Sequence, residues 1–169
     1  DATNHCHGLA LVLLANAHAL RVGIPGARDG LEDSFAVMEQ RFWEPGAKLY
    51  ADHALPDWRV SSYRSQKANL HACEALIAAH HATGDARYLQ RAALVADGMT
   101  QQLAAQTDGL VWEHYVLDKQ GDWAPDRDRS KNAQRSSGYQ AGHLAKWARL
   151  LVTLERAQPE PAEGGQRVH

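Results

Sequence analysis

The sequence predicts an all-α fold built from helical hairpins, and three observations lead to this prediction. Apolar residues recur at three- and four-residue steps over long stretches, which is the period of one face of a helix. Glycine, proline and aspartate interrupt these stretches where helices are expected to end and begin. A histidine opens the first predicted helix of each of three units, at His7, His71 and His143.

The first predicted hairpin comes from the beginning of the chain. The apolar face of its first helix contains Leu9, Val12, Leu13 and Leu20. Gly23 follows at a position typical of a helix C-terminal cap. The second helix lies in ARDGLEDSFAVMEQRFW and ends at EPG. Its apolar face contains Leu31, Phe35, Met38 and Phe42.

The second predicted hairpin repeats this design. Its first helix lies in QKANLHACEALIAAHHATGD, and Thr83-Gly84-Asp85 reads as a helix end followed by a new N-cap. Its second helix lies in DARYLQRAALVADGMTQQLAAQ. A last helix, GHLAKWARLLVTLER, follows a long polar loop at 116–138 and is predicted to be the first arm of a third hairpin.

The three opening histidines indicate an internal repeat. They are 64 and 72 residues apart, counting from 7 to 71 and from 71 to 143. If similar hairpins pack side by side, their first helices begin at the same end of the assembly. We therefore expect His7, His71 and His143 to converge there.

Composition indicates one soluble globular unit and excludes some partners. The chain has 169 residues, of which 44% are hydrophobic, and its formal charge is −2. No basic surplus favours nucleic acid or an anionic membrane, and no apolar run is long enough to span a bilayer. Cys6 and Cys73 lie in apolar helical patterns, which predicts free, buried thiols of a reducing compartment and a cytoplasmic location.

Both ends suggest a piece of a longer protein. The chain opens at Asp1 inside a predicted helix, and PEPAEGGQRVH reads as a tail. We expect residues 1–157 to be part of a single catalytic domain and residues 158–169 to be disordered.

His71 and Glu74 are the first candidates for chemistry. They lie three residues apart, so imidazole and carboxylate share one face of a helix. One interpretation is a surface pair that contributes roughly a few tenths of a kcal/mol. The other is half of an active site, which the polar residues Tyr63, Arg64 and Asn69 just upstream favour.

His143 is the second candidate. It follows Gly142 and opens the last helix, where the positive end of the helix dipole favours an uncharged imidazole that can accept a proton. A buried structural histidine is the alternative. Tyr139 and Gln140 are candidates for hydrogen bonds to a polar ligand.

Several tryptophans are predicted in loops at the same end. WEHY at residues 112–115 places an aromatic ring beside a carboxylate and an imidazole, and Trp58 and Trp123 lie in other loops. Loop tryptophans stack on sugar rings or serve as hydrophobic plugs, and both interpretations stay open.

The motifs for metal and nucleotide cofactors are weak or missing. His71 and Glu74 form HxxE rather than HExxH, and no second chelating pair is close in sequence. No glycine-rich phosphate loop, GxSxG elbow or dinucleotide fingerprint occurs. We therefore expect no metal and no cofactor.

Three ordered blocks resemble the N-acylglucosamine 2-epimerase superfamily, especially its mannose isomerase branch. They are YRSQKANLHACEALIAAHHATGDARYLQRA, WEHY with DWAPD, and GYQAGHLAKWARLL. The resemblance implies an (α/α)6 barrel, a ring of six helical hairpins with the active site at one end of its cavity, of which about half is present. It also implies a monosaccharide substrate that reacts at C2 through a cis-enediolate, without a metal or redox cofactor.

The resemblance also implies roles for particular residues. Two histidines of the family act as acid and base, and they correspond to His71 and His143. Glu74 corresponds to the carboxylate that partners the first of these. The positions that bind or orient the sugar correspond to His7, Arg64, Glu113, Trp123 and Gln140. One position departs from the family, because the usually acidic residue before Trp147 is Lys146 here.

These roles agree with the chemistry of an aldose. Abstraction of the weakly acidic C2 proton needs a base such as neutral His143, and we expect His71, kept basic by Glu74, to act as the acid. Return of the proton to C1 gives a ketose, whereas return to the opposite face of C2 gives an epimer. The YRSQKANLH block favours interconversion of D-mannose and D-fructose.

Other functions stay open. One is an aldose or N-acylglucosamine 2-epimerase, and another is a helical module that binds carbohydrate without catalysis. Assembly into a homo-oligomer is also left open.

Overall fold

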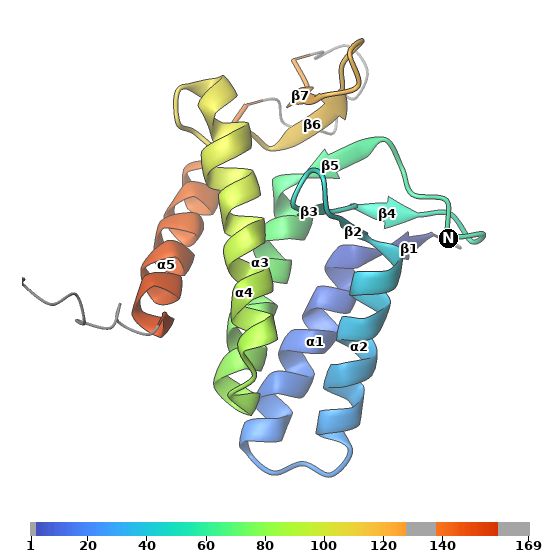
Figure 1. The fold of residues 1–169 in the computed structure, drawn as a ribbon, viewed down its shortest axis with the longest axis vertical. Coiled ribbons are helices and arrows are strands. Elements are labelled where there is room, and N and C mark those ends of the chain that lie inside the picture. The colour runs from blue at the N-terminus through green and yellow to red at the C-terminus, as the bar shows by residue number, and fades with distance from the viewer. Residues whose placement is uncertain (1–2, 128–137, 159–169) are drawn as a thin grey trace, which may run out of the picture.

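The computed structural model describes residues 3–127 and 138–158 (Figure 1). Residues 159–169, nearly all of the predicted tail, lie outside the described residues. Within the described ranges, no helix has both the length and the apolar character needed to cross a bilayer.

Helices dominate the fold, and both predicted hairpins are confirmed. The α-helices are α1 (Cys6–Arg21), α2 (Ala27–Arg41), α3 (Gln66–Thr83), α4 (Ala86–Asp97) and α5 (Ala141–Ala157). α1 packs against α2 and α3, and α3 packs against α4 and α5 (Figure 1). α1, α3 and α5 therefore begin at one end of the molecule, while α2 and α4 run back toward it.

Local chemistry sets the helix ends. The Ser65 side chain caps α3 by accepting a hydrogen bond from the amide of Ala68 at 3.2 Å. Gly84 ends α3 in the left-handed conformation, with φ of 73°, and the carboxylate of Asp85 then caps α4. The predicted stop and restart at 83–85 is confirmed.

The second arm of the second hairpin is less regular than predicted. α4 ends at Asp97 and is continued by the π-helix η1 (Gly98–Leu103) and the 3-10 helix η2 (Ala104–Thr107). A Cβ on Gly98 would lie 2.8 Å from the carbonyl oxygen of Lys48, so only glycine allows the β2–β3 turn to approach this closely.

Short strands were not predicted, and all of them lie at the end where α1, α3 and α5 begin (Figure 1). The two-stranded sheets are β1 (Asn4–His5) with β4 (His53–Ala54) and β2 (Trp43–Glu44) with β3 (Leu49–Tyr50). A three-stranded antiparallel sheet joins β5 (Tyr63–Ser65), β6 (His114–Leu117) and β7 (Trp123–Pro125). The segment predicted as a loop from residue 116 thus contains paired backbone.

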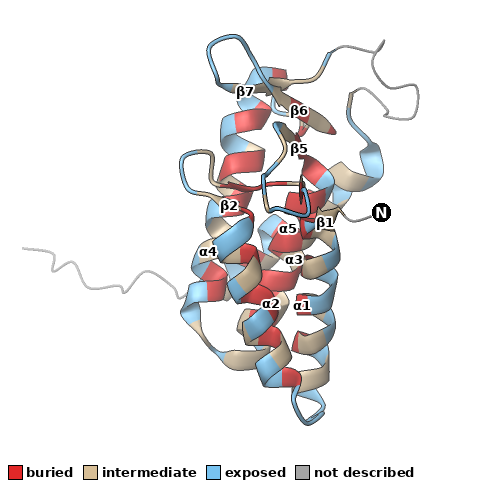
Figure 2. Ribbon diagram, turned by 90° about the vertical axis from the view of Figure 1, so that its right-hand side faces the viewer, coloured by how far each residue is buried: buried red, intermediate tan, exposed pale blue. Residues whose placement is uncertain are grey.

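The core lies between the helices, where buried residues alternate with exposed ones along each helix (Figure 2). α3 is the most buried helix, because small side chains let its neighbours approach on several sides. Its fully buried alanines are Ala72, Ala75 and Ala79. Cys6 and Cys73 are free and buried, as predicted. Burial raises the pKa of the Cys73 thiol to about 12, so this thiol stays protonated.

One buried polar side chain ties the strands to the helices. Asn69 is fully buried in α3. Its carbonyl oxygen accepts from the amide of Tyr50 at 2.8 Å, and its amide donates to the carbonyl oxygens of Tyr50 at 3.1 Å and Ser65 at 3.2 Å. The Asn69 side chain thus makes the hydrogen bonds to β3 that a neighbouring strand would otherwise make.

We predict that Asn69→Ala destabilises the fold by about 2–4 kcal/mol, because it leaves two backbone groups of Tyr50 buried without partners. Urea unfolding followed by circular dichroism measures this loss. Asn16→Ala is the matched control, since Asn16 donates only a local bond to Val12 at 3.1 Å. Equal unfolding midpoints for the two variants would contradict the role of Asn69.

Candidate active site

Three helices bring the predicted histidines to one end of the molecule. His7 and His143 lie in the first turns of α1 and α5, and His71 lies in the second turn of α3. The rings of His7 and His71 meet edge to face, with centroids 4.7 Å apart. α5 joins them through Lys146, whose ammonium lies 3.4 Å from Nδ1 of His71. His7 and His71 therefore meet, and His143 lies at the same end of the molecule with a partner of its own.

His71 and Glu74 belong to a larger charged cluster. Nδ1 of His71 lies 3.5 Å from Oε2 of Glu74. From α5, Lys146 approaches the same carboxylate oxygen at 2.7 Å, and Arg149 donates to Oε1 at 2.6 Å. His71 and Glu74 are therefore not an isolated surface pair, because two cations of α5 also bind Glu74.

The charge balance around His71 differs from the expectation. Burial, followed by the positive charge of Lys146 and by His7, lowers the pKa of His71 below its ordinary value, and the attraction of Glu74 does not compensate. Burial raises the pKa of Glu74, but the hydrogen bonds and charges of Lys146 and Arg149 outweigh it and lower this pKa. The effect of Glu74 on the pKa of His71 has the expected direction, but burial and Lys146 outweigh it.

His7 shares this environment. Burial, and then the positive charge of Lys67, lowers the pKa of the His7 imidazole. Both lowered pKa values favour the neutral form of the ring. Two neutral imidazoles, which can each donate and accept a hydrogen bond, therefore lie side by side at the start of α1 and α3.

His143 has a different partner. Its Nδ1 lies 2.9 Å from Oε1 and 3.1 Å from Oε2 of Glu113, whose side chain is only 5% exposed. A carboxylate only accepts, so Nδ1 of His143 carries the proton and Nε2 has the lone pair when the ring is neutral. This tautomer is assigned from the partner, and it makes Nε2 able to take a proton from a substrate.

A buried amide holds Glu113 in place. Nε2 of Gln66 donates to Oε1 of Glu113 at 3.1 Å, and Oε1 of Gln66 accepts from the indole of Trp147 at 2.9 Å. Gln66 and Trp147 are almost fully buried. The network runs from α5 through the start of α3 to the residue before β6, so it positions His143 from three segments.

Arg64 and Trp123 form a separate unit. Arg64 is buried, its NH2 donates to Glu44 at 2.8 Å, and its NH1 donates to the carbonyl oxygens of Ser61 and Tyr63. The guanidinium carbon lies 4.3 Å from the centre of the Trp123 ring. Arg64 thus supports Trp123 and holds the loop before β5.

Gln140 lies beside His143, whereas Trp58 and Trp112 have other partners. Gln140 is exposed at the N-cap of α5, where its carbonyl oxygen accepts from the amide of His143 at 3.1 Å. Trp58 packs against Phe42, which favours the plug interpretation for this ring. The indole of Trp112 donates to a backbone carbonyl in the loop after β7.

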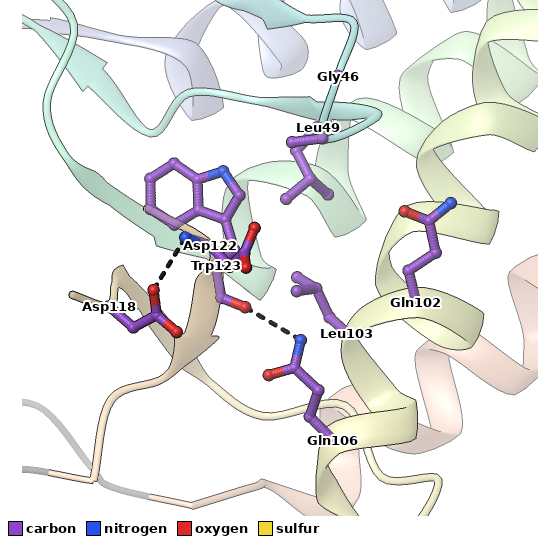
Figure 3. Close-up of a pocket in the computed structure, with 9 residues that line it drawn as sticks. Gly46, Leu49, Gln102, Leu103, Gln106, Asp118, Asp122 and Trp123 are labelled. Carbon is purple, nitrogen blue, oxygen red and sulfur yellow. Dashed lines mark hydrogen bonds between the residues drawn. The ribbon is translucent and has the colours of Figure 1, made fainter. Parts of the chain in front are cut away.

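Two cavities border these groups. One of about 420 Å³ has Trp123 as a wall and is also lined by Gly46, Ala47, Leu49, Gln102, Leu103, Gln106, Asp118 and Asp122 (Figure 3). No histidine lines it. The other, of about 300 Å³, lies between α1, α3 and α5 and includes Glu74 and Arg149. The second cavity is the one that borders the charged cluster.

The described ranges contain no group of three or more His, Cys, Asp or Glu residues placed to hold a metal ion. No metal ligand is therefore assigned among these residues.

Sequence reasoning missed three partners. Gln66 and Glu44 carried no motif, and Lys146 was noted only as a departure from the family. A signal existed for Lys146, because it lies three residues after His143 and so shares its helix face. Gln66 and Glu44 act over 47 and 20 residues of sequence, where no local pattern indicates the pairing.

Comparisons with known proteins show which proteins this chain is similar to. The D-mannose isomerase of Marinomonas mediterranea is 43% identical over 95% of this chain, and that of Thermobifida fusca is 37% identical over 95%. The chain spans about 40% of the length of these relatives, 41% and 40% respectively. A crystal structure of D-mannose isomerase superposes with a TM-score of 0.82 at 43% identity, covering 94% of this chain and 41% of that one.

More distant structures share only the fold. Cellobiose 2-epimerase from Spirochaeta thermophila superposes with a TM-score of 0.72 at 16% identity, over 92% of this chain and 39% of that chain. The predicted fold class is confirmed, with part of an (α/α)6 barrel present. The family model of N-acylglucosamine 2-epimerase matches residues 1–165. The chain therefore belongs to the N-acylglucosamine 2-epimerase family.

Proposed function

We propose that the protein containing this chain is an isomerase that interconverts D-mannose and D-fructose. The observation that carries this proposal is the pair His143–Glu113, which leaves a neutral imidazole nitrogen free to accept a proton near a second imidazole at the same end of the barrel. The D-mannose isomerases similar to this chain support the choice of substrate.

His143 is proposed as the base. In the open-chain sugar, Nε2 of His143 takes the proton from C2, and the electron pair of that C–H bond forms the C1–C2 double bond of the cis-enediolate. As this double bond forms, the π electrons of the C1 carbonyl move to O1, which takes a proton from His71. The same nitrogen of His143 then returns the proton to C1, and the C2 hydroxyl gives its proton back to His71, so that C2 becomes the carbonyl carbon of the ketose. Glu113 stabilises the imidazolium that forms between the two transfers.

His71 is proposed as the acid. Its imidazole donates to the sugar oxygen that gains negative charge, and it assists opening of the pyranose ring. Glu74 holds the α5 cations beside it. His7, whose ring contacts His71, is proposed to bind the sugar hydroxyls together with Gln140.

Arg64 and Trp123 are proposed as an aromatic wall of the sugar site. Arg64 has its donors occupied by Glu44 and backbone carbonyls, so its part is to orient the Trp123 ring rather than to contact substrate. The reaction is proposed to need no metal or cofactor, and the location is proposed to be cytoplasmic.

Epimerisation at C2 is the second candidate function. The same base and the same intermediate serve an epimerase, which returns the proton to the opposite face of C2. Membership of the N-acylglucosamine 2-epimerase family supports this second candidate. A helical module that binds carbohydrate without catalysis is the candidate of another class.

We predict that the full-length protein converts D-mannose to D-fructose in deuterated water with exchange at the carbon-bound proton, and that a chelator has no effect. Proton NMR follows both events. Formation of glucose would instead indicate an epimerase, and sugar binding without exchange would indicate the binding module.

We predict that His143→Ala and His71→Ala each lower kcat about 10²- to 10⁴-fold, the usual contribution of a positioned acid or base. His81→Gln is the control, because His81 is exposed in the last turn of α3. Turnover near the wild-type value in either alanine variant would exclude the proposed role of that histidine.

We predict that Glu113→Gln lowers kcat about 10- to 100-fold with little change in KM. An amide can present its NH2 to Nδ1, which moves the imidazole proton to Nε2 and removes the base. Steady-state kinetics with D-mannose separates the two parameters. A raised KM at constant kcat would instead place Glu113 in direct contact with the sugar.

We predict that residues 1–169 produced alone are inactive or unstable. Leu11 and Val12 of α1 and Leu151 and Val152 of α5 are exposed apolar side chains, which further barrel hairpins would cover. Sedimentation and the mannose assay test this. A stable, active monomer would contradict the prediction.

A further inference from the structure

Lys146 occupies a position that the proposed reaction does not yet explain. It lies one helical turn after His143 on α5, and its ammonium is 2.7 Å from Oε2 of Glu74 and 3.4 Å from Nδ1 of His71. Its side chain is 25% exposed. Arg149, one further turn along, is 61% exposed and donates to the other oxygen of Glu74.

Hydrogen-bond chemistry makes Lys146 and Glu74 compete for Nδ1 of His71. An ammonium only donates, so beside Lys146 the nitrogen must accept, and the imidazole proton then lies on Nε2. A carboxylate only accepts, so Glu74 at 3.5 Å would draw the proton to Nδ1.

The surrounding charges decide this competition. His71 faces His7 from α1, Glu74 from its own helix, and Lys146 and Arg149 from α5. Both oxygens of Glu74 already bind a cation, which weakens the attraction between this carboxylate and a proton on the imidazole. Two cations and one carboxylate leave a net positive charge beside His71, which disfavours protonation of its imidazole.

We propose that Lys146 is a positioning residue that holds His71 neutral with its proton on Nε2, the tautomer opposite to the one that Glu113 imposes on His143. His71 then donates a hydrogen bond from Nε2, whereas His143 accepts a proton at Nε2. This division rests on the proposed function, in which one imidazole protonates oxygen while the other takes a proton from carbon. The lowered pKa of His71 agrees with it.

The identity of residue 146 therefore has a chemical consequence. An acidic side chain there would accept from Nδ1 and remove the proton from Nε2. Lysine instead donates to Nδ1 and so favours the proton on Nε2.

The test is ¹⁵N NMR of histidine-labelled full-length protein, with His71→Asn used to assign the His71 signals. The wild type is expected to show a protonated Nε2 and an unprotonated Nδ1. In Lys146→Met, and further in Lys146→Glu, the proton is expected to move to Nδ1 and the His71 titration midpoint to rise. Arg149→Met is the matched control, since it removes a cation from Glu74 without removing the contact to Nδ1, and it should keep the wild-type tautomer.

Three outcomes would overturn the inference: a protonated Nδ1 on neutral wild-type His71, an unchanged tautomer in a folded Lys146→Met, or an equal change in Arg149→Met. Kinetics adds a second readout, with kcat expected to fall about tenfold in Lys146→Met at nearly constant KM and to recover in Lys146→Arg. If the wild type converts no sugar, the proposed function fails, but the NMR result still decides the role of Lys146.

Discussion

The hydrogen bonds of one buried amide, that of Gln66, connect the parts on which the site depends. Gln66 opens α3, accepts from Trp147 of α5 and donates to Glu113 ahead of β6. Its side chain is fully buried, so an unmatched donor or acceptor would be costly and the arrangement is strongly favoured. Because Glu113 in turn holds His143, the orientation of that imidazole is fixed by the packing of two helices and not by α5 alone.

The short strands matter because their register sets where these groups meet. β5 leads directly into α3, and Ser65 of β5 pairs with His114 of β6, so Glu113 is brought next to the first turn of α3. The backbone amide of Gln66 donates to the carbonyl oxygen of Glu113 at 3.0 Å and continues this pairing into the helix. A slip of one residue in β6 would turn Glu113 away from the site.

The two histidines of the proposed reaction differ in charge environment although both lie near the start of a helix, His143 in the first turn of α5 and His71 in the second turn of α3. His143 faces a buried carboxylate, whereas His71 faces a carboxylate that two α5 cations already engage. A pair of titratable groups in contrasting environments is the usual basis for dividing acid and base roles between two residues of one type. The asymmetry arises from the contact between α3 and α5, since His143 and Lys146 on α5 face different partners.

Sequence alone determined the α-helices, most of their ends and the shared direction of the three histidine-bearing helices, but it did not predict that α4 stops at Asp97. These features follow from apolar periodicity, from caps such as Ser65 and Gly84, and from the repeat, all of which are local or regular. The resemblance to a family named the two histidines and Glu74 as the partner of His71, whereas the bond between Glu113 and His143 came from the tertiary structure. Tertiary structure decided the strand pairing, the partners of Gln66 and the charge balance at His71. The pairing of β5 with β6, the bonds of Gln66 and the contact of Lys146 with His71 join residues 47 to 81 positions apart, and such contacts leave no period or spacing in the sequence.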